Sequence, residues 1–472
     1  MSISASAIQS LRETLVSSLT FTPQDEGYQE ALRRWSDTGR KEAGIVIQPT
    51  EEQDIVTALK WSQEHKIDLA VKCGGHSVSG TSSSAGGLVI DLSRLNSVSV
   101  NTTDKTVTVG GGATWKDVDE AAAEYGLAAV GGTVNHTGVG GLTLGGGYGW
   151  LSGAYGLTID NLLSATIILA DGSIITASPA SHADLFWALR GAGYNFGIVT
   201  SFTFQAHDQP NPVYAGIIAF PPPQVGPVIS ALNSLFVDTP SPHAGSICIF
   251  AQPPGAPVPM VNVVLFYNGT ESEGRAYFAP LLSLNPVADM TSSIPYSKVN
   301  AIQNPMATYG DRKSFKGVFF NPPLSPEFAG QMLADFSAKL EAEPDLGTSA
   351  LLFEFYDMSK IVSVPRDATA FASRGTTQNG VINLRWTDSS KDLEHRAWAR
   401  EMQERWKVNL EGEGKTQDGG VPQYINYAEP GDAVVGNIYG ENLPRLKELK
   451  AKYDPTNVFR KMHPITLDST PI

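Results

Sequence analysis

Glycine is concentrated in one short stretch of the chain, and this stretch restricts the possible folds more than any other. Nine of the 19 residues from Gly131 to Gly149 are glycine. A regular helix or strand does not tolerate this density, because each glycine there costs roughly 0.5–1 kcal/mol relative to alanine. The backbone must therefore run close to something bulky. A cofactor phosphate or ring system would account for the pattern, and so would close packing between two backbones.

A second segment of small residues, Lys72 to Gly80, follows a predicted strand at Ile67 to Val71. Successive small residues expose backbone N–H groups, which can surround a pyrophosphate because no side chain blocks its approach. Lys72 adds a positive charge. His76 is the nucleophilic side chain placed to reach a bound ligand. The alternative is a tight turn that carries a buried, hydrogen-bonded histidine.

Charge and composition exclude several classes of partner. The 472-residue chain has 34 basic and 48 acidic residues, a formal net charge of −14, which disfavours nucleic acid and anionic membranes as partners. Two cysteines, Cys73 and Cys248, are too few for a disulfide scaffold, although a single bridge between them stays open. We see no secretory signal and no apolar run of about 18 residues. We therefore expect an intracellular, cytoplasmic protein.

The length and the element pattern indicate more than one domain. Strand and helix signals alternate as far as the predicted strand Ile198 to Gln205, and a proline-rich stretch from Pro210 to Pro223 then marks a boundary. Later strand runs and amphipathic helices predict a second α+β domain. A tail of about 50 residues is too short for its own core and should pack on the first domain. The predicted divisions are a helical lead-in at 1–38, a first domain at 39–208, a second domain at 209–420 and a C-terminal segment at 421–472.

Common nucleotide and metal motifs do not explain the glycine segments. Neither segment contains Gly-x-Gly-x-x-Gly, which disfavours a Rossmann site. Two cysteines and eight scattered histidines give no zinc-ligand spacing, so we expect no metal.

The C-terminal segment carries a third candidate group, Tyr424-Ile425-Asn426-Tyr427. A phenol can act as a general base where its surroundings make it more acidic. An asparagine can orient a ring or a substrate hydroxyl. The alternative is that the tyrosines only cover a seam between domains.

Together these segments resemble the berberine-bridge-enzyme-like oxidases, within the flavoprotein superfamily of vanillyl-alcohol oxidase and p-cresol methylhydroxylase (PCMH). Further motifs in the same order along the chain carry the resemblance. They are Tyr155 to Asn161 followed by Ala170-Asp171-Gly172, Asp184 to Gly191 followed by Asn195 to Thr200, and Tyr439 to Asn442 followed by Tyr453 to Phe459.

The resemblance implies an α+β fold, with a two-lobed PCMH-type FAD-binding domain and a substrate domain whose antiparallel β-sheet is covered by helices. It implies FAD as the cofactor, attached covalently through His76. The residues implied to bind FAD are Lys72, Cys73, Gly74, Gly75, His76, Ser77, Gly80, Thr133, Thr137, Gly138, Gly140, Gly141, Gly145, Gly147, Gly197, Ile198 and Val199.

The sequence departs from the family pattern at one position. Many members carry a second flavin link from a cysteine in the loop Gly131 to Gly141, and Val134 occupies that position here. We therefore expect one covalent bond and not two. His136 then becomes a polar group near the flavin that binds substrate, tunes the ring or hydrogen-bonds the backbone. Some members use a glutamate base, for which Glu354 is a candidate.

The implied reaction is hydride transfer from a CH–OH group of a small or medium-sized metabolite to FAD, with reoxidation by O2 or another acceptor. Tyr424 is the candidate base, supported by Asn426 and Tyr427, and His136 belongs to the same site. Two alternatives are a biosynthetic flavoenzyme that forms a ring or a double bond, and a flavin-binding protein without turnover.

Overall fold

The structure, a computed structural model, describes residues 3–412, 423–429 and 435–467. Residues 3–208, here the glycine-loop region, contain two sheets. The first sheet has the order β1-β2-β4-β3, with β2, β4 and β3 parallel and β1 antiparallel to β2. Its strands are β1 (Leu19–Phe21), β2 (Ile45–Gln48), β3 (Leu69–Lys72) and β4 (Leu88–Asp91). The predicted lead-in is thus not wholly helical, because β1 extends this sheet.

The second sheet of the glycine-loop region is antiparallel and has the order β5-β6-β10-β8-β9, with β7 also paired to β10. Its strands are β5 (Val98–Asn101), β6 (Thr106–Gly110), β7 (Leu127–Ala129), β8 (Leu162–Ile168), β9 (Ile174–Ala177) and β10 (Ile198–Asp208). The helices of this region are α1 (Ala5–Thr14), α2 (Tyr28–Ala31), α3 (Glu52–Glu64), α4 (Trp115–Ala123), α5 (Val139–Leu144), α6 (Ser152–Tyr155) and α7 (Ala183–Ala192).

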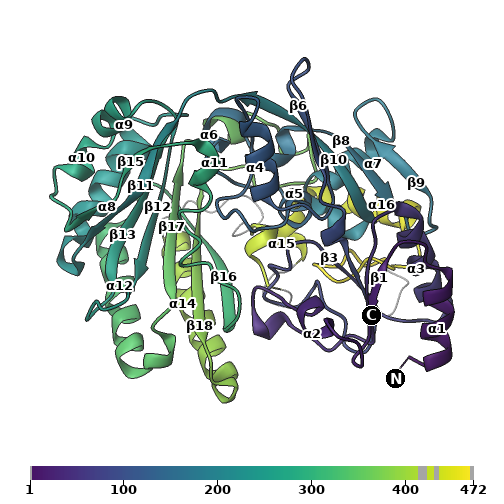
Figure 1. The fold of residues 1–472 in the computed structure, drawn as a ribbon. Helices are drawn as coiled ribbons and strands as arrows, with labels where there is room; N and C mark the ends of the chain where they lie inside the picture. The colour runs from purple at the N-terminus through teal and green to yellow at the C-terminus, as the bar shows by residue number, and fades with distance from the viewer. Residues whose placement is uncertain (1–2, 413–422, 430–434, 468–472) are drawn as a thin grey trace.

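Residues 213–412, here the large-sheet region, are built on an antiparallel sheet of order β14-β11-β13-β12-β17-β18-β16, with β15 also paired to β11 (Figure 1). Its strands are β11 (Val213–Phe220), β12 (Ala244–Ala251), β13 (Met260–Tyr267), β14 (Ala288–Asp289), β15 (Ser292–Ile294), β16 (Arg312–Phe320), β17 (Ala350–Tyr356) and β18 (Gln378–Trp386). Its helices are α8 (Val225–Asn233), α9 (Glu271–Tyr277), α10 (Ala279–Leu282), α11 (Tyr296–Val299), α12 (Pro326–Ala342), α13 (Ser359–Val362) and α14 (Asp392–Gly412).

The two faces of the large sheet have different neighbours. Side chains alternate between faces along a strand, so Cys248 and Phe250 of β12 pack in a core with residues of α8, α12 and α14. Ile247 and Ile249 of the same strand belong to a second core, together with residues of the glycine-loop region. One face of the sheet is therefore covered by helices, and the other is directed at the glycine loops.

The C-terminal segment returns to the glycine-loop region. Its helices are α15 (Val435–Tyr439) and α16 (Leu443–Tyr453), drawn in yellow in Figure 1. Tyr439 and Leu446 are fully buried in the core that contains β10 and α7. Lys450 is buried as well, where it donates hydrogen bonds to Asp454 and to the backbone oxygens of Asn195 and Phe459.

Two general expectations can be compared with the described residues. Cys73 and Cys248 are both free thiols, so the bridge that the sequence left open does not form. Within residues 3–412, 423–429 and 435–467, no helix has both the length and the apolar character needed to cross a bilayer.

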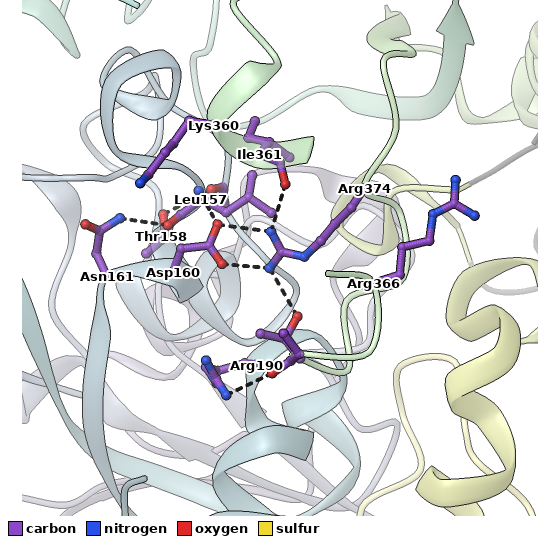
Figure 2. A network of polar contacts seen from close by, with 12 residues as sticks. Leu157, Thr158, Asp160, Asn161, Arg190, Lys360, Ile361, Arg366 and Arg374 are labelled. Carbon is purple, nitrogen blue, oxygen red and sulfur yellow. Dashed lines mark hydrogen bonds and ion pairs between the residues drawn. The ribbon is translucent and has the colours of Figure 1, made fainter. Parts of the chain in front are cut away.

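A buried ion pair fastens the large-sheet region to the glycine-loop region (Figure 2). The guanidinium of Arg374 donates to both carboxylate oxygens of Asp160, at 2.7 and 3.1 Å, and its side chain is completely buried. The same guanidinium donates to the hydroxyl of Thr369. Phe371, in this segment, packs at 6.0 Å from the ring of Tyr424. The ion pair therefore holds a segment that supports a candidate site residue.

We expect Arg374→Ala to lower the free energy of unfolding by about 3–5 kcal/mol, because it leaves the Asp160 carboxylate buried without its counter-charge. Urea unfolding followed by tryptophan fluorescence measures this loss. Lys407→Ala is the control, since among the described residues Lys407 pairs only with Glu404 and Glu411 on the exposed helix surface, worth about 0.5 kcal/mol. Equal losses in the two variants would contradict a structural role for the Arg374–Asp160 pair.

Candidate functional site

A cavity of about 1410 Å³ lies between the glycine loops, the large sheet and the C-terminal segment. Ligand pockets usually measure roughly 300–1,000 Å³, so this space suits a large cofactor together with a second molecule. The sequence-predicted residues that line it are Cys73, Gly74, Gly75, His76, Ser77, Thr133, Val134, Thr137, Gly138, Gly140, Gly141, Gly197, Ile198, Val199, Tyr424, Asn426 and Tyr427.

Five other predicted residues do not line the cavity, and their contacts explain why. The ammonium of Lys72 is bound at 2.9 Å by the buried carboxylate of Asp91. Gly80 packs against the backbone oxygen of Gly39, and Gly145 packs against the side chain of Asn426. Gly147 uses its backbone N–H to donate to the hydroxyl of Tyr424. The fifth residue, His136, is hydrogen-bonded through its Nδ1 to Nε2 of His76.

The loop after β3 presents unused backbone donors to the cavity. Within the described part of the chain, the N–H groups of Gly75, Ser77 and Val78 have no hydrogen-bond acceptor, although all three residues line the cavity. Gly75 adopts φ +70°, a left-handed conformation that turns successive N–H groups toward one side. Backbone amides left free in such a turn can bind an anion, so these residues are compatible with the pyrophosphate site that the sequence predicts.

Most glycines of the dense segment allow close contact within the protein. A Cβ on Gly138 would lie 2.4 Å from the backbone nitrogen of Gly74, and one on Gly149 would lie 1.6 Å from the oxygen of Gly131. Gly141 differs, because a Cβ there would meet no protein atom within 4 Å and the residue lines the cavity. Close packing between backbones therefore accounts for Gly138 and Gly149, whereas a cofactor close to Gly141 stays a prediction that the open space there permits.

His76 is held by aromatic neighbours and by a second histidine. Its ring stacks on Trp35 with 5.1 Å between centroids, and its Nε2 lies 2.8 Å from Nδ1 of His136. Burial, followed by the charges of His136 and Lys313, lowers the pKa of His76 to about 3. Burial also lowers the pKa of His136. Both imidazoles are therefore neutral at pH 7, the form in which histidine is a nucleophile or a base.

Glu354 provides a carboxylate at the same cavity. Tyr427 donates its hydroxyl proton to Oε1 of Glu354 at 2.7 Å, and Asn379 donates to Oε2 at 3.2 Å. Burial raises the pKa of Glu354 to about 7, although these two hydrogen bonds oppose the shift. A carboxylate with this pKa exchanges protons near neutral pH, which is the property of a general base.

The hydroxyl of Tyr424 is arranged differently from that of Tyr427. It accepts hydrogen bonds from the backbone N–H of Gly147 at 3.1 Å and from the amide of Asn426 at 2.8 Å. A phenol oxygen has two acceptor positions and one proton, so the proton of Tyr424 remains for another acceptor. Burial raises the pKa of Tyr424. Tyr424 is therefore a hydrogen-bond donor beside the Tyr427–Glu354 pair, with 4.7 Å between the two tyrosine rings.

Sequence reasoning assigned no role to Trp35 and gave Glu354 only a minor one, yet both line the cavity. Glu354 carries a usable signal, since it is the one charged residue of the otherwise apolar strand Ala350–Tyr356. Trp35 has no comparable signal, because it belongs to a loop of the lead-in that is distant from the glycine segments in the sequence.

Two family models match this chain. Residues 43–178 match the FAD binding domain, and residues 423–466 match the berberine and berberine-like segment. The first match contains both glycine segments and His76. The second contains Tyr424, Asn426 and Tyr427, which the structure brings to the same cavity.

The fold is shared with solved oxidases. 6-Hydroxy-D-nicotine oxidase from Arthrobacter nicotinovorans superposes with a TM-score of 0.80 and 25% identity, covering 96% of this chain and 98% of that one. A glucooligosaccharide oxidase from Acremonium strictum gives 0.81 and 22% identity, with 98% of each chain covered. At that lower identity the likeness concerns the fold alone.

Sequence relatives extend over nearly the whole chain. The FAD-linked oxidoreductase pgmH of Aspergillus terreus is 34% identical over 471 residues, which is 97% of this chain and 95% of the relative. An FAD-linked oxidoreductase of Dictyostelium discoideum is 30% identical, with 94% of each chain covered. The chain belongs to the berberine-bridge-enzyme-like family of FAD-linked oxidoreductases, and it is an FAD-dependent oxidoreductase.

Proposed function

We propose that this protein is an oxidase that takes a hydride from a CH–OH carbon of a small or medium-sized metabolite and passes the electrons to O2. One observation carries the proposal: a single cavity is lined by the loop after β3 with its free backbone N–H groups, by His76 and by the Tyr427–Glu354 pair. Bound FAD would supply the two-electron acceptor for the substrate carbon. The protein must then hold the substrate hydroxyl and remove its proton.

The free N–H groups of Gly75, Ser77 and Val78 fit a pyrophosphate, and the open space at Gly141 fits a group that approaches the backbone. The apolar side of Ile198 and Val199 lies in the same cavity and suits an aromatic base. These features support FAD binding by the cavity-lining residues of the glycine-loop region. Lys72, Gly80, Gly145 and Gly147 would then act by shaping these loops.

We propose that FAD is attached covalently through His76 alone. The hydrogen bond to His136 fixes Nε2 of His76, and with Nε2 as donor the lone pair lies on Nδ1. With FAD bound, His136 would accept the Nε2 proton as Nδ1 replaced a hydrogen of the flavin methyl group; the two electrons released would reduce the flavin, which O2 would reoxidise. Val134 lines the cavity and has no nucleophilic atom, which supports a single link.

The hydrogen bonds favour a different division of roles among the tyrosines from the one expected from the sequence. We propose that Tyr427 receives the substrate hydroxyl proton while its own proton passes to Glu354. Tyr424 donates a hydrogen bond that orients the substrate oxygen, because Gly147 and Asn426 already fill its acceptor positions. Asn426 also donates to the backbone oxygen of Leu142 and so ties the tail to α5.

The proposed function is tested by mixing the purified protein anaerobically with a panel of aliphatic, benzylic and sugar alcohols while recording flavin absorbance. At least one alcohol should bleach the flavin, and readmitted O2 should restore the colour with one peroxide per turnover. A protein that no alcohol bleaches, but that a non-hydroxylated metabolite does, would overturn the proposal in favour of ring or double-bond formation.

We expect Gly138→Ala to lower the flavin content of the purified protein several-fold. The new Cβ would press on the Gly74 backbone and on Sγ of Cys73, at 2.4 and 2.5 Å, and would push the two cofactor loops apart. The ratio of flavin to protein absorbance measures the effect. Gly226→Ala is the matched control, because a Cβ at Gly226 meets no atom within 4 Å. Full flavin content in Gly138→Ala would contradict the assigned loop contact.

A further inference from the structure

The wall of the cavity opposite the glycine loops is one face of the large sheet, and its residues lie in rows across the strands. The pairing of β12, β17 and β18 sets Ile249 opposite Leu352, and Leu352 opposite Val381. The next row along the strands consists of Ala251, Ala350 and Asn383. All six residues line the cavity. The central row is entirely apolar, and Glu354 stands two residues beyond it on β17.

Most polar groups on this wall are already used within the protein. Arg385 donates to the hydroxyl of Thr308 and to the carboxylate of Asp311, both at 2.7 Å. Asn262 donates to backbone oxygens of its own sheet. Gln303 donates to the oxygen of Thr133. A sugar needs many free partners for its hydroxyls, and this wall offers few.

Two atoms on this wall are exceptions. Nε of Arg385 is buried without a partner although the rest of its guanidinium is bonded, and Asn383, which lines the cavity and is 7% exposed, has a buried Oδ1 with no hydrogen-bond partner among the described residues. Leaving such a group unpaired is unfavourable, so a ligand that pairs with the amide would bind more tightly. Asn383 is four residues from Asn379, the partner of Glu354, and this spacing corresponds to about 13 Å along a strand.

We propose that the substrate is an elongated, largely apolar alcohol. Its reacting CH–OH lies at Tyr427 and Glu354, its apolar body rests on the row Ile249–Leu352–Val381, and a distant hydroxyl pairs with the amide of Asn383. The assignment of the reacting end rests on the proposed function. The assignment of the apolar row and of Asn383 to a binding subsite rests on the sheet face alone.

The test compares three probes by their dissociation constants, measured anaerobically from protein fluorescence after the flavin has been reduced with dithionite, so that no probe is turned over. The probes are para-phenylbenzyl alcohol, the same molecule with a para-hydroxyl on the far ring, and cellobiose. In the unmodified protein, the hydroxylated biphenyl should bind about 3- to 10-fold more tightly than its parent, as expected for one hydrogen bond. Cellobiose should bind at least tenfold more weakly than either.

Variants separate the two parts of the subsite. Asn383→Leu should bring the two biphenyl alcohols within twofold of each other, whereas Asn383→Asp keeps an acceptor and should keep the preference. Leu352→Asn should weaken the binding of both alcohols several-fold without changing their ratio. If Asn383→Leu does not fold with flavin bound, the binding ratio of the two biphenyl alcohols in the unmodified protein and in Leu352→Asn still tests the proposal.

Equal binding of the two biphenyl alcohols to the unmodified protein, or tighter binding of cellobiose, would overturn the proposal. So would a preference that survives in Asn383→Leu. Because the readout is binding, its failure is distinct from that of the proposed function. Alcohols that bind with the expected ratio but never bleach the flavin would refute alcohol oxidation and leave the subsite assignment standing.

Discussion

His76→Ala should yield a protein whose flavin is released completely by acid or denaturant. The native protein should instead keep its flavin on a denaturing gel, visible as a fluorescent band after acid treatment. The reason is that His76 lines the cavity with a neutral imidazole, which can act as a nucleophile. Val134 also lines the cavity but has no atom that could form a second bond. The expected effect is all or none: fluorescence at the protein band disappears in the variant.

Two further variants make this result specific. Cys73→Ser should keep the fluorescent band, because Cys73 also lines the cavity but burial raises the pKa of its thiol and makes it a poor nucleophile. His136→Ala should slow the appearance of the band during incubation of apoprotein with FAD, since it removes the acceptor for the Nε2 proton. A fluorescent band that persists in His76→Ala would refute the attachment site.

Glu354→Gln should lower the rate constant of flavin reduction by about 10²–10⁴-fold, the usual contribution of a general base. Glutamine keeps the shape and can still accept a hydrogen bond from Tyr427, but it cannot take the proton. Stopped-flow measurement of flavin bleaching isolates this step from reoxidation. Tyr427→Phe should cause a loss of the same order, because it interrupts the path between the substrate and Glu354.

The rate constant of flavin reduction should also change with pH in a defined direction. The carboxyl must be ionised to accept a proton, and its pKa is about 7, so the rate should fall about tenfold per unit below pH 7 and level off above it. This dependence should be absent in Glu354→Gln. Tyr424→Phe is the informative comparison, with an expected loss of only about tenfold. A much larger loss in Tyr424→Phe than in Tyr427→Phe would restore Tyr424 as the base.

The parts of the site that could be predicted are those in which the backbone itself has a role. The need for glycine at Gly75 and Gly141 can be predicted from the sequence. Gly75 adopts a left-handed turn that side chains disfavour, and Gly141 leaves open space beside its backbone because it has no side chain. The fold class followed from the resemblance that the ordered motifs carry, and the return of the tail followed from its being too short for a core of its own. Glycine density does not reveal which neighbour each glycine accommodates: Gly145 and Gly147, predicted to contact the cofactor, pack against protein atoms and do not line the cavity.

The substrate side was harder to predict for a physical reason. Its wall consists of single residues from separate strands, and strand order and register bring them together. Asn383 and Glu354 are distant in sequence, and their strands meet only in the β17–β18 pairing. A polar residue within an apolar strand is a usable signal, but it does not say which face of the sheet it occupies or what lies opposite.

Asn426 and the two tyrosines beside it come from the last tenth of the polypeptide, whereas the loop after β3 comes from its first fifth. The tail also completes the core that contains β10 and α7, because Tyr439 and Leu446 are buried there. During synthesis, this core and the cavity can therefore reach their final form only after the last residues have left the ribosome. A chain that ends before the tail should lack both these core contacts and the three polar side chains that the tail brings to the cavity.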